Sequence, residues 1–186
     1  STLAEKQAVL RRAGRRLPRL LTRRLFPFWY GTRWTIRGAT TQPRVGSIAC
    51  GTFVATLLHH AGFRVERDDL GAQNSPQLMK TLTDQRYMTL TWGWPVARFL
   101  RMVRRKGRGL YVVGLDMHVG FLLVTGSRRH AHRRTVWFVH SSPWDPVHVI
   151  KRRAEKDGVF TASRYRLIAR LTADPRLMEA WIFGQP

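Results

Sequence analysis

The chain has 186 residues, of which 44% are apolar, and carries 33 Lys and Arg against 11 Asp and Glu, a formal charge of +22. This length suits one domain with its own core, and seven Trp and nine Phe exclude a disordered chain. No apolar run approaches the ~20 residues that span a bilayer, so we expect no transmembrane segment. The single cysteine excludes an intramolecular disulfide.

The excess of positive charge favours polyanionic surroundings such as nucleic acid, anionic lipid or an acidic wall polymer. Arg outnumbers Lys 28 to 5, and codon composition alone can also produce such a bias. The chain begins at Ser1 rather than at a methionine, which we interpret as a mature or trimmed form whose targeting segment lies outside this sequence.

Residues 2–25 read as a basic helical arm. Their apolar residues recur near a 3.6-residue period, with Gly14 and Pro18 as interruptions. We expect residues 1–27 to form this arm and residues 28–186 to form one domain. The favoured interpretation is a solvated helix that packs on the domain by its leucines, and the alternative is an arm that binds a membrane surface or an anionic polymer.

An aromatic loop, "FPFWYGTRW", follows the arm, and a Gly/Pro/Thr-rich segment leads to Cys50. From Cys50 onwards the apolar residues predict a helix that stops at Gly62, with Cys50 in its first turn. Further helices are predicted near 75–84, where Ser75 and Pro76 suit a cap and first turn, and near 95–105. The aromatic loop "TWGWP" lies between these two helices.

In the second half of the chain the spacing of the apolar residues changes from a helical to a strand pattern. Short β-branched and aromatic runs at 109–115, 118–126 and 135–142 predict strands, and "RRHAHRR" between the last two predicts an exposed hairpin loop. "VHVIKR" predicts an edge strand, and residues 174–182 predict a closing helix. Helices first and strands afterwards indicate an α+β fold with helices packed on an antiparallel sheet.

Three polar residues stand out within apolar surroundings: Cys50 at a helix start, His118 at a strand start and His140 at the end of the next strand. A hairpin would place the two histidines side by side, with the helix of Cys50 packed against them. A helix N-terminus lowers the pKa of a thiol, and a nearby histidine can act as its base. The alternative is a cysteine that only packs in the core and histidines without a chemical role.

These residues resemble the NlpC-type cell-wall cysteine peptidases, a branch of the papain-like fold. The resemblance covers roughly residues 28–150 and rests on four motifs in the family's order. The motifs are "GTRWTIRG" (31–38), "ACGTFVATLLHHAGF" (49–63), "HVGFLL" (118–123) and "FVHSSP" (138–143).

The resemblance implies that Cys50 is the nucleophile, His118 the general base and His140 the residue that orients this base. Trp34 occupies the place of a tyrosine near the oxyanion site. The chain departs from the family at Ala49, where an acidic residue is usual, and at Gly51–Thr52, where Ser-Gly is usual. From their aromatic character, Trp92, Trp94 and Trp144 are candidates to line a substrate cleft, or else pack in the core or loops.

The other polar candidates have simpler interpretations. His59 and His60 lie more than two turns from Cys50 and suit the helix end. His130 and His132 stand among arginines that would repel a cation, so no metal site is expected. His148 remains an alternative residue for the catalytic shell, and Asp116 suits a turn or a hydrogen bond near the site.

The resemblance implies a cysteine peptidase or amidase that cleaves amide bonds in peptidoglycan stem peptides, with a Cys50–His118–His140 mechanism, no cofactor and a bacterial cell-envelope location, periplasmic or secreted. Two alternatives remain. One is a catalytically inactive relative that binds wall peptides or a protein, as the altered neighbours of Cys50 would permit. The other is a basic nucleic-acid-binding protein, which we regard as the weaker prediction.

Overall fold

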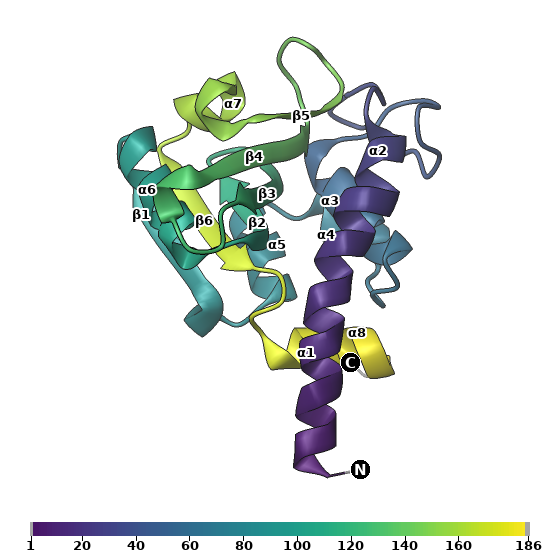
Figure 1. The fold of residues 1–186 in the computed structure, drawn as a ribbon. Helices are drawn as coiled ribbons and strands as arrows, with labels where there is room; N and C mark the ends of the chain where they lie inside the picture. The colour runs from purple at the N-terminus through teal and green to yellow at the C-terminus, as the bar shows by residue number, and fades with distance from the viewer. Residues whose placement is uncertain (1, 185–186) are drawn as a thin grey trace.

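The structure is a computed structural model that describes residues 2–184. It is built on one six-stranded sheet in which every neighbouring pair is antiparallel, in the order β1-β6-β2-β3-β4-β5 (Figure 1). The strands are β1 (Met88–Trp92), β2 (Gly109–Leu115), β3 (Val119–Gly126), β4 (Arg134–Ser141), β5 (Val149–Arg153) and β6 (Tyr165–Arg170).

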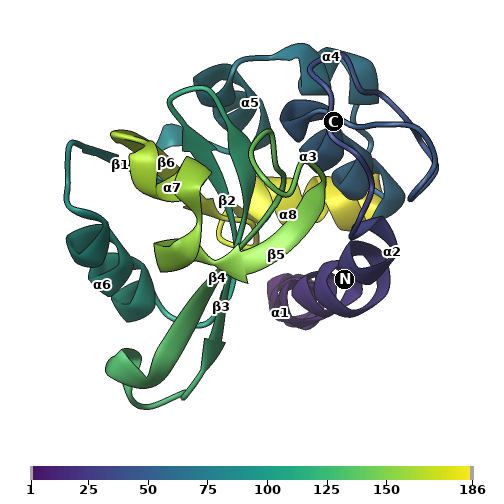
Figure 2. The same ribbon diagram turned by 90° about the horizontal axis from the view of Figure 1, so that it is seen from above.

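Helices cover both faces of the sheet (Figure 2). One face carries α1 (Leu3–Leu20), the π-helical turn η1 (Leu21–Leu25), α2 (Phe26–Trp29), α3 (Cys50–His60), α4 (Arg67–Ala72), α5 (Ser75–Leu82) and α8 (Pro175–Phe183). The other face carries α6 (Val96–Lys106) and α7 (Gly158–Ala162). Because successive strand residues point to opposite faces, Phe121 packs in the first core and Leu122 in the second.

The coarse fold class predicted from the sequence, α+β with an antiparallel sheet, is confirmed. The helix at Cys50 begins at the expected residue, and Gly62 just beyond it has φ +95°, in the left-handed region that favours glycine. The helix near residue 75 is capped by Asn74 rather than Ser75, because the Asn74 side chain accepts the N–H of Gln77. β5 is an edge strand, as predicted.

The N-terminal segment differs from the expectation in two ways. Its helix runs through Gly14 and Pro18 without a break, and the helical turn α2 continues it where an aromatic loop was predicted. Phe26 and Trp29 are fully buried and hold this turn in the core. Leu17 is also fully buried, so the second half of α1 belongs to the main core. Within residues 2–184 no helix combines the length and apolarity needed to cross a membrane.

Besides α2 and the short 3₁₀ turns, four helices and strands were not predicted: α4, β1, α7 and β6. The "TWGWP" segment is only partly a loop, because Thr91 and Trp92 end strand β1 and pair with β6. β6 carries the buried Arg166 in the middle of the sheet, and such a charge hides the apolar signature of a strand. The Arg166 Nη1 and Nη2 groups donate to the backbone oxygens of Trp94 and Phe160, which replace part of the water that the guanidinium has lost, while its Nε is buried without a partner among the described residues.

Candidate active site

Cys50 is the first residue of α3 and lies at the end of a loop that is tied to the sheet. The N–H of Ala49 donates to the Gly38 oxygen at 2.8 Å, and the Ser141 hydroxyl donates to the Ile48 oxygen at 2.7 Å. Ser141 follows His140 directly on β4. The last turn of the loop is therefore fixed beside the strand that carries His140, and the thiol is placed by backbone contacts on both sides.

His118 and His140 lie side by side, as the hairpin of β3 and β4 predicts. His118 Nε2 and His140 Nδ1 are 2.8 Å apart, and the two rings are nearly perpendicular. The pair depends on Gly120, since a Cβ there would stand 2.8 Å from the Cβ of His140 and 2.7 Å from the Phe138 ring. The Phe138 ring stacks on His140 with centroids 4.0 Å apart and holds its imidazole in place.

Asp157 extends this pair and was not predicted. Its Oδ2 lies 3.0 Å from His140 Nε2, while its Oδ1 accepts the N–H of Phe160 and caps α7. Both Asp157 and His140 are almost completely buried, at 1% and 0% exposure. An N-cap aspartate before α7 was the only available sequence signal, and a cap in a helix of five residues says nothing about a histidine 17 residues away.

The Asp157 carboxylate fixes the tautomers of both rings. An ionised carboxylate only accepts hydrogen bonds, so His140 Nε2 must carry the proton and, in a neutral ring, His140 Nδ1 must accept. His118 Nε2 then donates to that nitrogen, which leaves His118 Nδ1 without a proton. The His118 ring therefore presents an unprotonated nitrogen, Nδ1, that can accept a hydrogen bond.

The thiol pKa corrects one expectation from the sequence. The helix N-terminus was expected to lower the pKa of Cys50, but burial raises it by more than the backbone N–H groups of Val119, Gly51 and Cys50 lower it. Removal of water from a thiolate opposes its formation, and this effect outweighs the N–H groups that donate to the sulfur. The resting residue is therefore a neutral thiol at neutral pH.

Burial also keeps both imidazoles neutral. It lowers the pKa of His118 to about 3, against an opposing effect of Asp157, and it lowers the pKa of His140 as well. Burial raises the pKa of Asp157, but the hydrogen bonds from His140 and Phe160 outweigh it, so this pKa lies below its usual value. A carboxylate, two neutral imidazoles and a neutral thiol thus make up the resting state.

The N-terminus of α3 places backbone donors beside the thiol, and the N–H groups of Cys50 and Gly51 donate to the resting sulfur. Its cap residue is Ala49, and nothing in the described part of the chain provides a side-chain cap for it. The first N–H groups of a helix have no partner within the helix, so an anion that forms at this place would be stabilised by them. The departure at Ala49 therefore exposes these donors, whereas an acidic residue there would compete for them.

Cys50 and His118 open into one cavity of about 560 Å³. Its walls are formed by residues 36–39, 49–52, 68, 71–75 and 116–119. The rim contains the strongly exposed Ile36 and Met117, beside the cation of Arg37. A substrate that reaches the thiol thus meets apolar and charged side chains at the entrance of the cavity. At its inner end lies His118, the first residue of the buried series His118–His140–Asp157.

The predicted substrate-binding tryptophans do not line this cavity. Trp34 is held in the loop before Cys50 by its backbone bond to Val147, Trp92 stands 63% exposed on the edge strand β1, and the Trp94 ring is covered by the Arg98 guanidinium at 3.9 Å. The aromatic character of Trp92 and Trp94 makes them cleft candidates, but β1 pairs with β6 and takes Trp92 to the sheet edge.

The remaining histidine candidates lie apart from the catalytic geometry, whereas Asp116 lines the cavity. His59 and His60 are at the far end of α3, His130 and His132 are exposed in the β3–β4 loop, and His148 is half-buried with Nδ1 near its neighbour's carbonyl oxygen. The Asp116 carboxylate accepts the N–H groups of Arg164 and Tyr165, which anchors the start of β6. Among residues 2–184 no group of three or more His, Cys, Asp or Glu converges as it would around a metal ion.

A scan against protein-family models and searches of curated proteins and of solved structures find no match to this chain.

Proposed function

We propose that this protein is a cysteine hydrolase that cleaves amide bonds, with Cys50 as nucleophile and His118 as general base, on a fold of the NlpC type. The single observation that carries the proposal is the buried, hydrogen-bonded series His118–His140–Asp157, which ends in a cavity beside a thiol at a helix N-terminus. A purely structural role does not require a carboxylate and two imidazoles in this order at full burial, because each of them loses hydration on burial.

The acylation step begins from neutral partners. As Cys50 Sγ attacks the carbonyl carbon of the bound amide, its proton passes to His118 Nδ1, and the carbonyl oxygen becomes an oxyanion beside the N–H groups at the start of α3. His118 is then an imidazolium, with its Nε2–H donated to His140. His118 next gives its proton to the departing amine, so the C–N bond breaks and a thioester remains on Cys50.

The deacylation step reverses the proton path. Water attacks the thioester carbon while His118 Nδ1 takes one of its protons, and the C–S bond breaks to release a carboxylic acid and return the proton to the thiolate. Asp157 acts through His140 as a positioning residue: it fixes the tautomers and stabilises the positive charge that arises on His118. This requirement is larger here than for a preformed ion pair, because burial keeps the resting imidazoles neutral.

The proposed substrate is the peptide part of peptidoglycan, and the proposed location is the cell envelope. Both come from the four motifs that resemble the NlpC-type peptidases. The strongly basic surface is compatible with an anionic wall, but it does not select one bond.

Digestion of purified peptidoglycan by the wild type and by Cys50→Ala, followed by mass analysis of the released fragments, tests the proposal. We expect new peptide fragments with a free amine from the wild type alone. Identical fragment profiles from the two proteins would contradict a thiol hydrolase, and a circular dichroism melt of both proteins checks that they are equally folded.

One observation favours a second candidate, an inactive relative that binds wall peptides. The raised pKa of Cys50 means that the thiol is not activated at rest. Alkylation of Cys50 separates the two: a rate near neutral pH that falls on His118→Gln indicates a base that assists the thiol, whereas a slow rate equal in both proteins favours the binder.

A further inference from the structure

The acidic residues of this chain are confined to a few segments, and three long stretches have none. Residues 6–65, 85–115 and 117–144 contain no Asp or Glu. These stretches build α1 with η1, helix α6 and the β3–β4 hairpin. The charge of +22 is therefore concentrated on particular elements rather than spread evenly over the molecule.

Several of the acidic side chains pair with basic side chains or histidines close to them. Asp84 pairs with Arg86 and Arg176, Glu155 pairs with Arg153, and Asp157 bonds to His140. In the part of the chain that the structure describes, no ion pair involves an arginine of α1, η1 or the hairpin loop. The cations on these elements therefore lack an acidic side-chain partner among the described residues.

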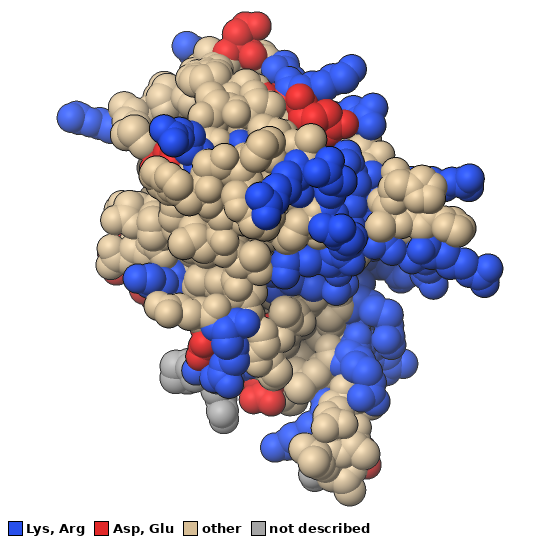
Figure 3. All heavy atoms as spheres, turned by 90° about the vertical axis from the view of Figure 1, so that its left-hand side faces the viewer, with Lys and Arg blue, Asp and Glu red and all other residues tan. Residues whose placement is uncertain are grey.

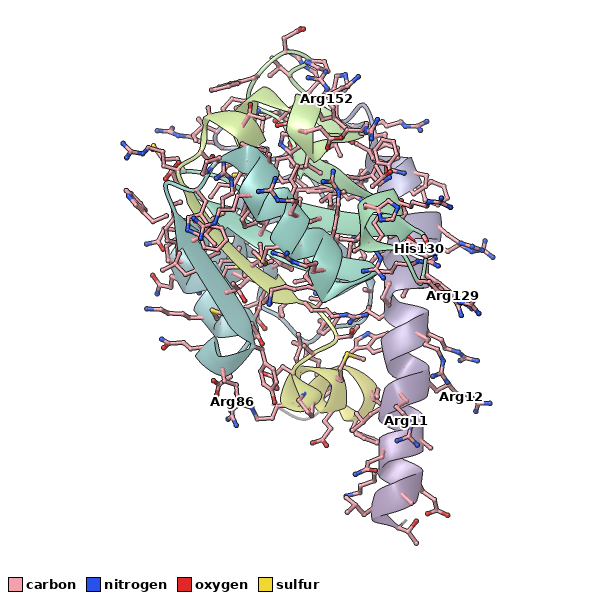
Figure 4. The ribbon with its side chains drawn as sticks, turned by 60° about the vertical axis from the view of Figure 1, so that its left-hand side comes forward. Arg11, Arg12, Arg86, Arg129, His130 and Arg152 are labelled. Carbon is pink, nitrogen blue, oxygen red and sulfur yellow. The ribbon has the colours of Figure 1, made fainter. Side chains whose placement is uncertain are left out.

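These exposed cations form what we call the basic face. Figure 2 shows the β3–β4 hairpin projecting between α6 and α1, and Lys and Arg crowd the right-hand side of Figure 3 with few acidic atoms among them. In Figure 4 the labelled side chain of Arg12 points away from the domain. The basic face consists of Arg11, Arg12, Arg15, Arg16, Arg19, Arg23, Arg24, Arg101, Arg105, Lys106, Arg128, Arg129 and Arg133.

The row of arginines on α1 and η1 matches the charge spacing of a polyanion. Seven arginines lie between Arg11 and Arg24, which spans about 20 Å of helix axis, or one charge per about 3 Å. The buried side of this helix is formed by Ala13, Leu17 and Leu21. Because the apolar side is already packed in the core, the helix presents little beyond charge to a partner.

We propose that the basic face binds a flexible, linear phosphate polymer through its clustered arginines. Arginine matches phosphate because its planar guanidinium donates two parallel hydrogen bonds to the oxygens. A flexible chain can follow α1 and also reach the projecting hairpin, whereas duplex DNA, with a persistence length of about 50 nm, is too stiff to follow an uneven surface.

Two other partners fit the face less well. A bilayer would need apolar side chains to insert, and the exposed large apolar residues on these elements are Leu3 and Val9, both near the free end of α1. Single-stranded nucleic acid binds best where bases stack on exposed Phe, Tyr or Trp rings, and α1, α6 and the hairpin loop expose none of these; the aromatic side chains exposed there are the imidazoles of His130 and His132.

The test measures binding of long-chain inorganic polyphosphate by fluorescence anisotropy over a range of salt concentrations. The first variant changes four arginines of α1 to Gln, and the control changes four exposed arginines elsewhere, so that both lower the formal charge from +22 to +18 (22 − 4). The first set is Arg11, Arg12, Arg15 and Arg16, and the control set is Arg64, Arg86, Arg153 and Arg176.

We expect the α1 variant to bind at least about tenfold more weakly near physiological salt and to lose about 3 from the slope of log K against log salt, at roughly 0.7 for each lost contact. The control variant should stay within about twofold of the wild type. Equal weakening in both variants would overturn the proposal, because the attraction would then follow net charge alone. Tighter binding to random-sequence duplex DNA or to anionic phosphatidylglycerol vesicles, at equal phosphate concentration, would also overturn it.

The result is independent of the proposed hydrolase. Cys50→Ala is expected to bind polyphosphate as the wild type does, so that loss of cleavage and loss of binding are separate outcomes. A hairpin variant, in which Arg128, Arg129 and Arg133 become Gln, should weaken binding less than the α1 variant because it removes fewer charges. Thermal melts of all variants, monitored by circular dichroism, establish that they are folded.

Discussion

The candidate active site and the basic face use charge in opposite ways. At the active site a single carboxylate, Asp157, is fully buried and organises two neutral imidazoles through hydrogen bonds. At the basic face many cations stand in water, and the chain segments that carry them contain no acid. The net charge of +22 therefore describes the second region and carries no information about the first, where one negative charge in the right place determines the proposed chemistry.

The substitution with the largest expected effect, Asp157→Asn, alters the active site and leaves the basic face unchanged. Asp157→Asn keeps an oxygen for the N–H of Phe160, so α7 stays capped, but its amide can donate to His140 Nε2 and reverse both tautomers. We expect kcat on peptidoglycan peptides to fall by about 10²-fold or more, with little change in polyphosphate binding.

The tautomer change has its own readout. Nitrogen-15 NMR of the imidazoles should show a protonated Nε2 on His140 in the wild type and an unprotonated one in Asp157→Asn. Unchanged tautomers together with unchanged kcat would remove Asp157 from the mechanism.

Acid should weaken the fold through the same groups. Burial lowers the pKa of His118 from 6.5 to about 3 and also lowers that of His140, so the unfolded chain binds more protons than the folded protein in this window. The contribution of these two histidines to the free energy of unfolding therefore has its full value above pH 6.5. It falls as the pH drops toward 3, by at most about 1.4 kcal/mol per pH unit for each group. Asp157, whose pKa is lowered, adds a loss below its ordinary pKa.

Urea unfolding at pH 7, 5 and 4 measures this dependence. His118→Gln should show a shallower decline than the wild type because one titrating group is gone. A stability that stays constant from pH 7 to pH 4 would contradict the buried neutral imidazoles.

The space around two glycines differs between the active site, which contains Gly51, and helix α1 of the basic face, which contains Gly14. A Cβ at Gly51, beside Cys50, would clash with the Gly71 backbone oxygen, so Gly51→Ala should destabilise the protein by about 1–3 kcal/mol. A Cβ at Gly14 in α1 meets only the Thr172 Cβ at 3.7 Å, so Gly14→Ala should stabilise it by up to about 1 kcal/mol through helix propensity. Urea unfolding of both variants measures the difference, and equal effects would show that the close contact of α3 with α4 has no cost.

The sequence was informative where residues contact their neighbours along the chain. The period of the leucines, the glycine after α3 and the β-branched runs predicted α3, α6, α8 and strands β2 to β5, and the hairpin placed His118 beside His140. These signals are local, since they depend on spacing within one helix or on one turn.

The sequence failed where the signal depends on distant contacts. Asp157 reaches His140 only because α7 follows β5 across the sheet face, and Arg166 is tolerated in β6 only because two distant carbonyl oxygens accept from it. The pKa of Cys50 was also predicted in the wrong direction, because a helix N-terminus can be read from the sequence whereas the burial of the thiol cannot.

The most direct test of the proposed relay is to trap its covalent intermediate. Peptidoglycan peptides are digested by the wild type in the presence of hydroxylamine, and the products are identified by mass. A thioester on Cys50 predicts that part of the carboxylic acid product is replaced by the hydroxamate, and that both products vanish in Cys50→Ala. Products that contain only the free acid, or that persist in Cys50→Ala, would contradict the account.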